Sequence, residues 1–210
     1  MSLPDGVERR ELDGRERLAT RGEPVGEEPH EDGWRAWDPR RSKLAAMLER
    51  GLPAGLEPGA TVLYLGAAAG TTVSHVADVA GPVYAVEFAA RPMRDLVAVA
   101  ESRPNVVPLL KDARAPERYA HVVESEVDLL VQDVATRGQA DVAAANARFL
   151  ADDGRLALAV KARSEDVTAD PEAVYDRVLG ALEADFEVLE TASLDPDHAD
   201  HLAAVGRPRR

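Results

Sequence analysis

The sequence TVLYLGAAAGTTVSHVADVAGPVYAVE, residues 61–87, indicates the fold most clearly. It begins with the apolar run 62–65, which has no polar alternation and is typical of a parallel strand buried on both faces. A bend of only Gly and Ala follows at 66–70, and a helical run continues through 71–79. A second apolar run at 83–86 then predicts the next strand. The stretch therefore predicts a βαβ unit with a ligand at its glycine-rich turn.

The turn also limits the kind of ligand. It reads GxxxG, with Ala68 where a dinucleotide-binding turn has its second glycine, and it lacks the GK[ST] ending of a P-loop. The start of the helix presents free N–H groups to an anion, and Glu87 at the next strand tip is placed to hold a ribose diol. A nucleoside with a carboxylate and no phosphate fits this pattern, and S-adenosylmethionine is such a ligand. The alternative is a purely structural tight turn.

Length and composition predict one ordinary domain with a small appendage. The chain has 210 residues and no Cys, which excludes disulfides and thiolate chemistry. It shows no apolar run long enough to span a bilayer and no apolar segment of a signal peptide. We therefore expect a soluble, cytoplasmic protein that does not enter a membrane.

The charge balance is strongly acidic. Asp and Glu number 38 against 25 Lys and Arg, a net charge of −13, and the three lysines are Lys43, Lys111 and Lys161. An acidic, Lys-poor, Ala-rich chain is typical of proteins adapted to very high intracellular salt. The net charge argues against nucleic acid as a partner. In molar salt, however, screening acts within about 3 Å, so close contacts decide binding and global charge matters little.

Residues 1–33 read as a short, charged N-terminal appendage, and residues 34–210 as the main domain. The appendage has too few apolar positions for an independent core, so we expect a hairpin-like element or a partly ordered arm. Both tryptophans, Trp34 and Trp37, follow it among basic residues. Basic side chains beside aromatic rings suit a sugar–phosphate backbone, and the predicted RNA contacts are Arg35, Arg40 and Arg41. The alternative is a Trp-anchored entry to a helix capped by Ser42, and both interpretations can hold together.

Strands and helices alternate through the rest of the chain. This order predicts an open, doubly wound, mostly parallel α/β sheet with its ligands at the carboxyl ends of the strands. We expect strands at 106–110, 127–131, 156–160, 186–194 and 202–205, helices at 93–102, 140–150 and 171–184, and a turn at 152–154.

Polar residues follow four of the predicted strands and should converge on one crevice. Any one of them alone would read as a solvated loop residue. Phe88 can offer its ring to a base, and Lys161 stands out because this chain has replaced most Lys by Arg, which cannot be deprotonated. The four residues are Glu87, Asp112, Asp133 and Lys161.

A metal site is not expected. His198 and His201 lie three apart among carboxylates, but Asp beside His is commonplace in so acidic a chain. One His at the site, or an ordinary loop, is the preferred interpretation.

Several blocks together resemble a known family. From about Trp34 to Arg207 the chain resembles archaeal fibrillarin, the RNA ribose 2′-O-methyltransferase of box C/D guide ribonucleoproteins. The blocks are RAWDPRRSKLAA (35–46), VLYLGAAAGTTVSHVAD (62–78), YAVEF (84–88), DAR (112–114), QDVA (132–135), VKARSEDVT (160–168) and DHLAAVGR (200–207). The resemblance implies the seven-stranded S-adenosylmethionine-dependent methyltransferase fold.

The resemblance also implies a set of site residues. Thr136 stands where the family usually has Gln, and Ala69 where Ser is common. The implied catalytic set is Lys43, Asp133, Lys161 and His201. Together with the turn, the implied cofactor-binding set is Gly66, Gly70, Thr71, Thr72, Glu87, Phe88, Asp112, Ala113, Asp133, Val134, Ala135 and Thr136.

The implied activity is transfer of the methyl group of S-adenosyl-L-methionine to ribose 2′-hydroxyls. Lys161 is expected to hold or deprotonate the hydroxyl while Asp133 aligns it. The implied partners are box C/D guide RNA, target rRNA and tRNA, a Nop-domain scaffold protein and a kink-turn-binding ribosomal-like protein. The alternatives are a cofactor-binding scaffold without catalysis, and a methyltransferase acting on small molecules or protein.

Overall fold

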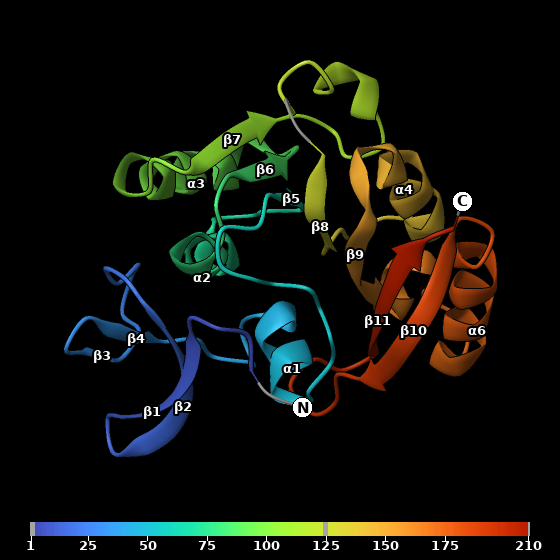
Figure 1. The fold of residues 1–210 in the computed structure, drawn as a ribbon. Helices are drawn as coiled ribbons and strands as arrows, with labels where there is room; N and C mark the ends of the chain where they lie inside the picture. Colours follow the sequence, from blue (N-terminus) through green and yellow to red (C-terminus); the bar gives the residue numbers. More distant parts are fainter. Residues whose placement is uncertain (1–2, 124–125, 210) are drawn as a thin grey trace.

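A computed structural model describes residues 3–123 and 126–209, which form two sheets flanked by helices (Figure 1). None of the helices in this described part of the chain is long and apolar enough to cross a membrane. The strands are β1 Val7–Leu12, β2 Arg15–Arg21, β3 His30–Glu31, β4 Trp34–Ala36, β5 Val62–Leu65, β6 Val83–Glu87, β7 Val106–Leu110, β8 Val127–Gln132, β9 Leu150–Lys161, β10 Phe186–Ser193 and β11 His201–Pro208. The α-helices are α1 Lys43–Glu49, α2 Thr71–Val79, α3 Ala90–Ser102, α4 Gln139–Asn146, α5 Ala162–Glu165 and α6 Pro171–Leu182, with short 3₁₀ turns η1 Pro116–Arg118 and η2 Ala147–Phe149.

The larger sheet has seven strands in the order β10-β11-β9-β8-β5-β6-β7. The strands from β9 to β7 in this order run parallel, and β11 is antiparallel to both β9 and β10. This confirms the predicted mostly parallel, doubly wound sheet. The chain reverses its direction across the sheet between β5 and β8, so the crevice outside their carboxyl ends is the expected ligand position.

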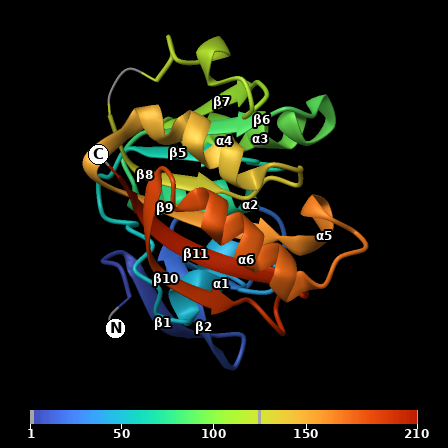
Figure 2. The same cartoon turned by 90° about the vertical axis from the view of Figure 1, so that its right-hand side faces the viewer.

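Alternate residues of each strand face different helical layers. On β5, Val62 and Tyr64 join the core beneath α1, α2 and α3, whereas Leu63 and Leu65 join the core beneath α4 and α6. Figure 2 shows α4 and α6 in front of the sheet and α1 behind it. Burial on both faces explains why the predicted strands read as unbroken apolar runs.

Helix boundaries follow local chemistry in most places. Ser42 caps α1 as predicted, with its side chain accepting a hydrogen bond from the Ala45 N–H. The predicted helix at 140–150 is shorter, because α4 ends at Asn146 and a 3₁₀ turn leads into β9. The predicted turn at 152–154 was wrong. Those residues lie within β9 as a bulge, since Leu150 pairs with Val127 while Arg155 already pairs with Leu129.

The smaller sheet has the order β1-β2-β4-β3, and all of its pairings are antiparallel. It contains the predicted hairpin, and it also takes in β4, which the sequence interpretation had placed in the main domain. Val7, Leu18 and Trp37 belong to the same core as α1 and α2. The N-terminal segment is therefore packed onto the large sheet's helical layer, as its small number of apolar residues requires.

A buried group of charges fastens the small sheet to α2. Arg35 on β4 places Nε 2.8 Å from Asp78 Oδ2 and Nη1 2.8 Å from Glu28 Oε1, and Arg103 Nε lies 3.1 Å from Asp78 Oδ1. Thr20 on β2 also donates to Asp78 Oδ2, at 2.8 Å. Glu28, Arg35, Asp78 and Arg103 are called the N-terminal network below.

Candidate active site

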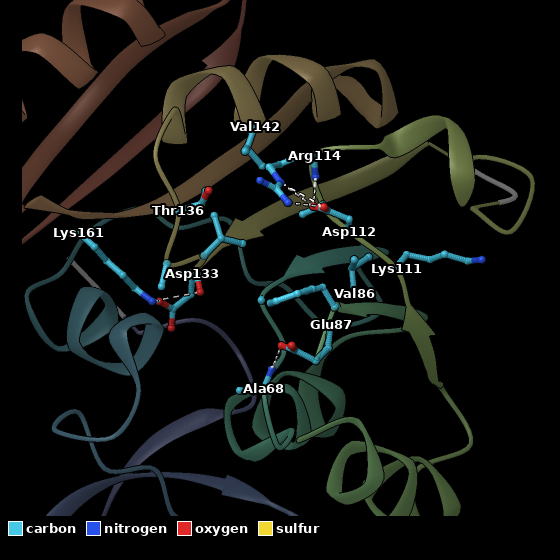
Figure 3. Close-up of a pocket in the computed structure, with 15 residues that line it drawn as sticks. Ala68, Val86, Glu87, Lys111, Asp112, Arg114, Asp133, Thr136, Val142 and Lys161 are labelled. Carbon is cyan, nitrogen blue, oxygen red and sulfur yellow. Dashed lines mark hydrogen bonds and ion pairs between the residues drawn. The ribbon is translucent and has the colours of Figure 1, made fainter. Parts of the chain in front are cut away.

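A cavity of about 410 Å³ opens at the carboxyl ends of the parallel strands (Figure 3). This volume lies within the usual range for small-molecule sites. It is lined by Gly66, Ala68, Val86, Glu87, Phe88, Lys111, Asp112, Ala113, Arg114, Asp133, Val134, Ala135, Thr136, Val142 and Lys161. Nine of the twelve predicted cofactor residues are in this set, and Gly70, Thr71 and Thr72 are not.

The three that do not line the cavity have structural roles nearby. Gly70 is the N-cap of α2 with φ of 85°, and a Cβ there would stand 2.9 Å from Leu96 Cδ1, so it lets α2 pack against α3. Thr72 hydrogen-bonds the hydroxyl of Tyr64, whose pKa is raised by burial. Thr71, the first residue of α2, accepts a hydrogen bond from Ser74 Oγ through its carbonyl.

The turn after β5 is held open by its own backbone contacts. A Cβ on Gly66, which has φ of 82°, would lie 2.4 Å from the Asp133 carbonyl oxygen, so only glycine permits this close approach between the β5 and β8 loops. Ala68 has φ of 48°, and its N–H donates to Glu87 Oε2 at 2.9 Å. The other Glu87 oxygen accepts from Ala89 N–H at 2.7 Å. Glu87 is thereby fixed at the cavity wall with 8% of its surface exposed.

An unusual aromatic side chain lies beside Glu87. Phe88 is 72% exposed although it lines the cavity. A phenyl ring left in water costs free energy that burial against a flat apolar ligand recovers. The ring is therefore accessible to a flat ligand in the cavity.

Asp112 and Arg114 form the opposite wall. Arg114 Nη2 lies 2.7 Å from Asp112 Oδ2, and Arg114 Nε lies 3.0 Å from Oδ1. The side-chain hydrogen bonds from Arg114 are the main cause that lowers the pKa of Asp112. Sequence reasoning selected Asp112 and Ala113 from the DAR block but missed Arg114, although its spacing from Asp112 favours such a bidentate pair.

The predicted catalytic lysines both reach Asp133. Lys161 Nζ lies 2.8 Å from Asp133 Oδ1, and Lys43 Nζ lies 3.2 Å from Oδ2. Figure 3 shows Lys161 extending from its strand tip toward Asp133 at the cavity edge. Burial raises the pKa of Asp133, but the two ammonium groups outweigh it, so the net pKa lies below its ordinary value and Asp133 is a carboxylate at neutral pH.

Asp133 Oδ1 is buried against the ammonium group of Lys161, 2.8 Å away. The same ammonium group also donates to the Asp133 carbonyl, at 3.3 Å. Lys43, Asp133 and Lys161 are called the Asp133 cluster below. Their side chains are 20%, 17% and 15% exposed.

His201 stands opposite Lys161 in the β9–β11 ladder. Burial is the main cause that lowers its pKa, and the charges of Lys43 and Lys161 add to it. Its Nδ1 lies 2.7 Å from the Ala199 carbonyl, so in the neutral imidazole Nδ1 carries the proton and Nε2 is free to accept one. His198 instead contacts the Pro39 carbonyl, at 2.7 Å. Among the described residues no three His, Asp or Glu side chains converge as a metal site.

The predicted RNA-contacting set changes. Arg35 is fully buried in the N-terminal network, so its side chain has no surface to offer RNA, and that prediction was wrong. Trp37 is buried and stacks on His75 with ring centroids 5.0 Å apart, which supports the alternative of a Trp-anchored entry to α1. Arg40 and Arg41 are exposed, with Arg40 paired to Asp38.

Comparisons with known proteins agree with this geometry. The sequence model of the fibrillarin family matches residues 14–210. The fibrillarin-like rRNA/tRNA 2′-O-methyltransferases of Halorubrum lacusprofundi and Haloarcula marismortui are 67% and 65% identical to this chain, over 99% and 100% of it and 98% and 100% of their own lengths. Both come from halophilic archaea, as the acidic composition predicted for this chain.

Solved structures give the same result. A Methanococcus jannaschii fibrillarin pre-rRNA processing protein superposes with a TM-score of 0.90 at 37% identity, covering 99% of this chain and 96% of that one. An Aeropyrum pernix fibrillarin with natively bound S-adenosyl-L-methionine gives 0.85 at 42% identity, covering 98% of each chain. A chain from a fibrillarin/Nop5p complex gives 0.89 at 40% identity, with full coverage of both. This chain belongs to the fibrillarin family.

Proposed function

We propose that this protein transfers the methyl group of S-adenosyl-L-methionine to ribose 2′-hydroxyls of rRNA and tRNA. The observation that carries the proposal is the Asp133 cluster at the edge of a nucleoside-sized cavity. The family relationship supports it, since relatives at 65–67% identity are named for this activity.

The cavity fits S-adenosyl-L-methionine in shape and chemistry. Phe88 provides an exposed ring for the adenine, Glu87 a fixed carboxylate for the ribose diol, and Asp112 an acceptor for the adenine amino group. When bound, the ligand supplies an electrophilic methyl group on its sulfonium. A solved relative with this molecule natively bound supports the assignment.

The Asp133 cluster orients and activates the attacking hydroxyl. The ribose O2′ forms a bond to the methyl carbon as the carbon–sulfur bond breaks, and the hydroxyl proton leaves to a base at the site. Asp133 is ionised and lines the cavity, so its carboxylate can align the hydroxyl or take this proton. Lys161 and Lys43 hold the carboxylate in place, and the neutral His201 offers Nε2 as a further acceptor.

The protein acts inside a ribonucleoprotein. The partners that we propose are box C/D guide RNA, a Nop-domain scaffold protein and a kink-turn-binding ribosomal-like protein, in the cytoplasm at high salt. The solved fibrillarin/Nop5p complex supports the scaffold. Arg40 and Arg41, exposed just before Lys43, are the proposed contacts to the RNA backbone.

Methyl transfer to RNA tests the proposal. The purified chain is incubated in molar KCl with labelled S-adenosyl-L-methionine and a target oligonucleotide, with and without guide RNA and the two partner proteins. We expect label at one 2′-oxygen only in the complete mixture. Cofactor binding without any transfer would indicate a non-catalytic scaffold, and transfer to protein or small molecules alone would indicate another methyltransferase.

A further inference from the structure

Lys161 sits just beyond the paired part of its strand. The β8–β9 ladder ends at the pair Gln132–Leu158, and β8 then leaves the sheet at Asp133. On the opposite side Lys161 remains opposite His201 of β11. The peptide groups of Lys161 that face β8 therefore lie beyond the end of that strand, and a buried N–H and C=O need partners.

A glutamine side chain supplies both partners. The N–H of Lys161 donates to Gln139 Oε1 at 2.9 Å, and Gln139 Nε2 donates to the Lys161 carbonyl at 3.1 Å. One amide side chain thus takes the place of the next residue of β8. Gln139 is fully buried and is the first residue of α4.

Gln139 is in turn held by two neighbours. Gln132 Nε2 donates to the Gln139 carbonyl at 2.7 Å. The Glu165 carboxylate accepts from the N–H groups of Gln139 and Gly138, at 2.5 and 3.0 Å, where a negative charge also complements the N-terminus of α4. Glu165 is the last residue of α5, the short helix that begins directly after Lys161. The contacts form a closed ring from β8 through α4 to β9 and α5.

We propose that Gln139 is a positioning residue for methyl transfer, which holds the backbone of Lys161 so that its Nζ meets Asp133, and that Glu165 secures it. The inference rests on the proposed function. A lysine side chain is long and flexible, so its ammonium position depends on where its Cα is held. Loss of the amide leaves the two peptide groups of Lys161 unpaired and lets the strand tip shift, while Glu87 and Phe88 stay in place.

The test compares Gln139→Leu with Asn105→Leu. Asn105 is a matched control because its amide also bonds backbone carbonyls, those of Ala77, Ala80 and Gly81, but outside the cavity. We expect Gln139→Leu to lower kcat at least tenfold at saturating cofactor and RNA, with the cofactor Kd within twofold. Asn105→Leu should lower the unfolding temperature without changing either value.

Lysine NMR gives a readout that does not need activity. With three lysines in the chain, selective ε-¹³C labelling gives three assignable signals. The Lys161 signal should shift in Gln139→Leu and, less strongly, in Glu165→Gln, and not in Asn105→Leu. An unchanged Lys161 signal in the folded variants, or an equal change in Asn105→Leu, overturns the inference. If Gln139→Leu does not fold, Glu165→Gln decides. A wild type that transfers no methyl would refute the proposed function, while the NMR comparison would still judge the positioning role.

Discussion

Two charge clusters in this molecule use the same chemistry in opposite ways. In the N-terminal network the side chains are at most 7% exposed, and Asp78 accepts from Thr20, Arg35 and Arg103. In the Asp133 cluster the side chains are 15–20% exposed, and Asp133 and Lys161 line the cavity. One cluster is closed, and the other borders a cavity.

The difference explains why the cations of the N-terminal network are arginines and those of the Asp133 cluster are lysines. Arginine forks satisfy several acceptors in a fixed plane and suit a closed structural network, whereas the compact lysine ammonium suits a site where a hydroxyl must enter. The fully paired buried charges hold the small sheet on α2. Removing a charge of either sign would leave its partner buried without a counter-charge. Charge alone therefore does not mark a catalytic site. The site that we propose as catalytic differs in its exposure to a cavity.

The largest effect is expected from Asp133→Asn. An amide cannot hold two ammonium groups or take a proton, so kcat should fall by about 10²–10⁴-fold, the usual contribution of general acid–base groups. Single-turnover methyl transfer in the assembled complex measures it. Asp128→Asn is the control, since Asp128 lies on the same strand but binds the Thr61 N–H. Activity within threefold of wild type would place the chemistry elsewhere.

Asp78→Asn should lower the stability of the fold and leave catalysis unchanged, the opposite of Asp133→Asn. It leaves Arg35 and Arg103 facing each other without their shared carboxylate, so the free energy of unfolding should drop by about 3–5 kcal/mol. Denaturant unfolding in molar KCl measures the loss, with the exposed pair variant Asp38→Asn as a control expected to change stability by about 1 kcal/mol or less. In the folded fraction kcat should be retained. If catalysis were lost and stability kept, it would be wrong to assign stability to the N-terminal network and catalysis to the Asp133 cluster.

The sequence predicted the Asp133 cluster better than the N-terminal network. Asp133 and Lys161 were selected because each lies at the end of an apolar parallel strand, and such ends meet at one edge of the sheet. Lys43 was implied by the family resemblance. Arg35 is buried because it pairs with Asp78, 43 residues away on another element, and no local sequence pattern predicts such a pairing. The partnership of Gln139 with Lys161 was missed for the same reason. The bulge in β9 was read as a turn because its Asp-Asp-Gly letters favour one.

Phe88→Ala tests whether the exposed ring in the cavity contributes to cofactor binding. Loss of stacking on a base costs about 1–3 kcal/mol, so the cofactor Kd should rise roughly 5- to 150-fold. Calorimetric titration measures it. Val97→Ala removes another exposed apolar side chain, away from the cavity lining, and should leave the Kd unchanged. Equal affinities for the two variants would rule out Phe88 as a base contact.

The smallest effect is expected in the pH dependence of stability, through His75. Burial lowers the pKa of His75 well below 6.5, so its stabilising contribution is present above the unfolded-state value. It is lost as pH falls from about 6.5 toward the folded-state pKa, by up to about 1.4 kcal/mol per pH unit. Unfolding curves between pH 7 and 5 measure the loss, and His75→Gln should flatten it. An equally steep loss in that variant would assign the titration to other groups.

We infer that an ammonium group at position 161, held on Asp133, is needed for methyl transfer but not for cofactor binding. Methyl transfer to a guided RNA target by Lys161→Arg in the assembled complex tests this, because Arg keeps the charge but cannot reproduce the compact ammonium group of Lys. We expect cofactor binding within twofold of wild type and transfer reduced at least a hundredfold. Full transfer by Lys161→Arg would show that methyl transfer does not need an ammonium group at position 161.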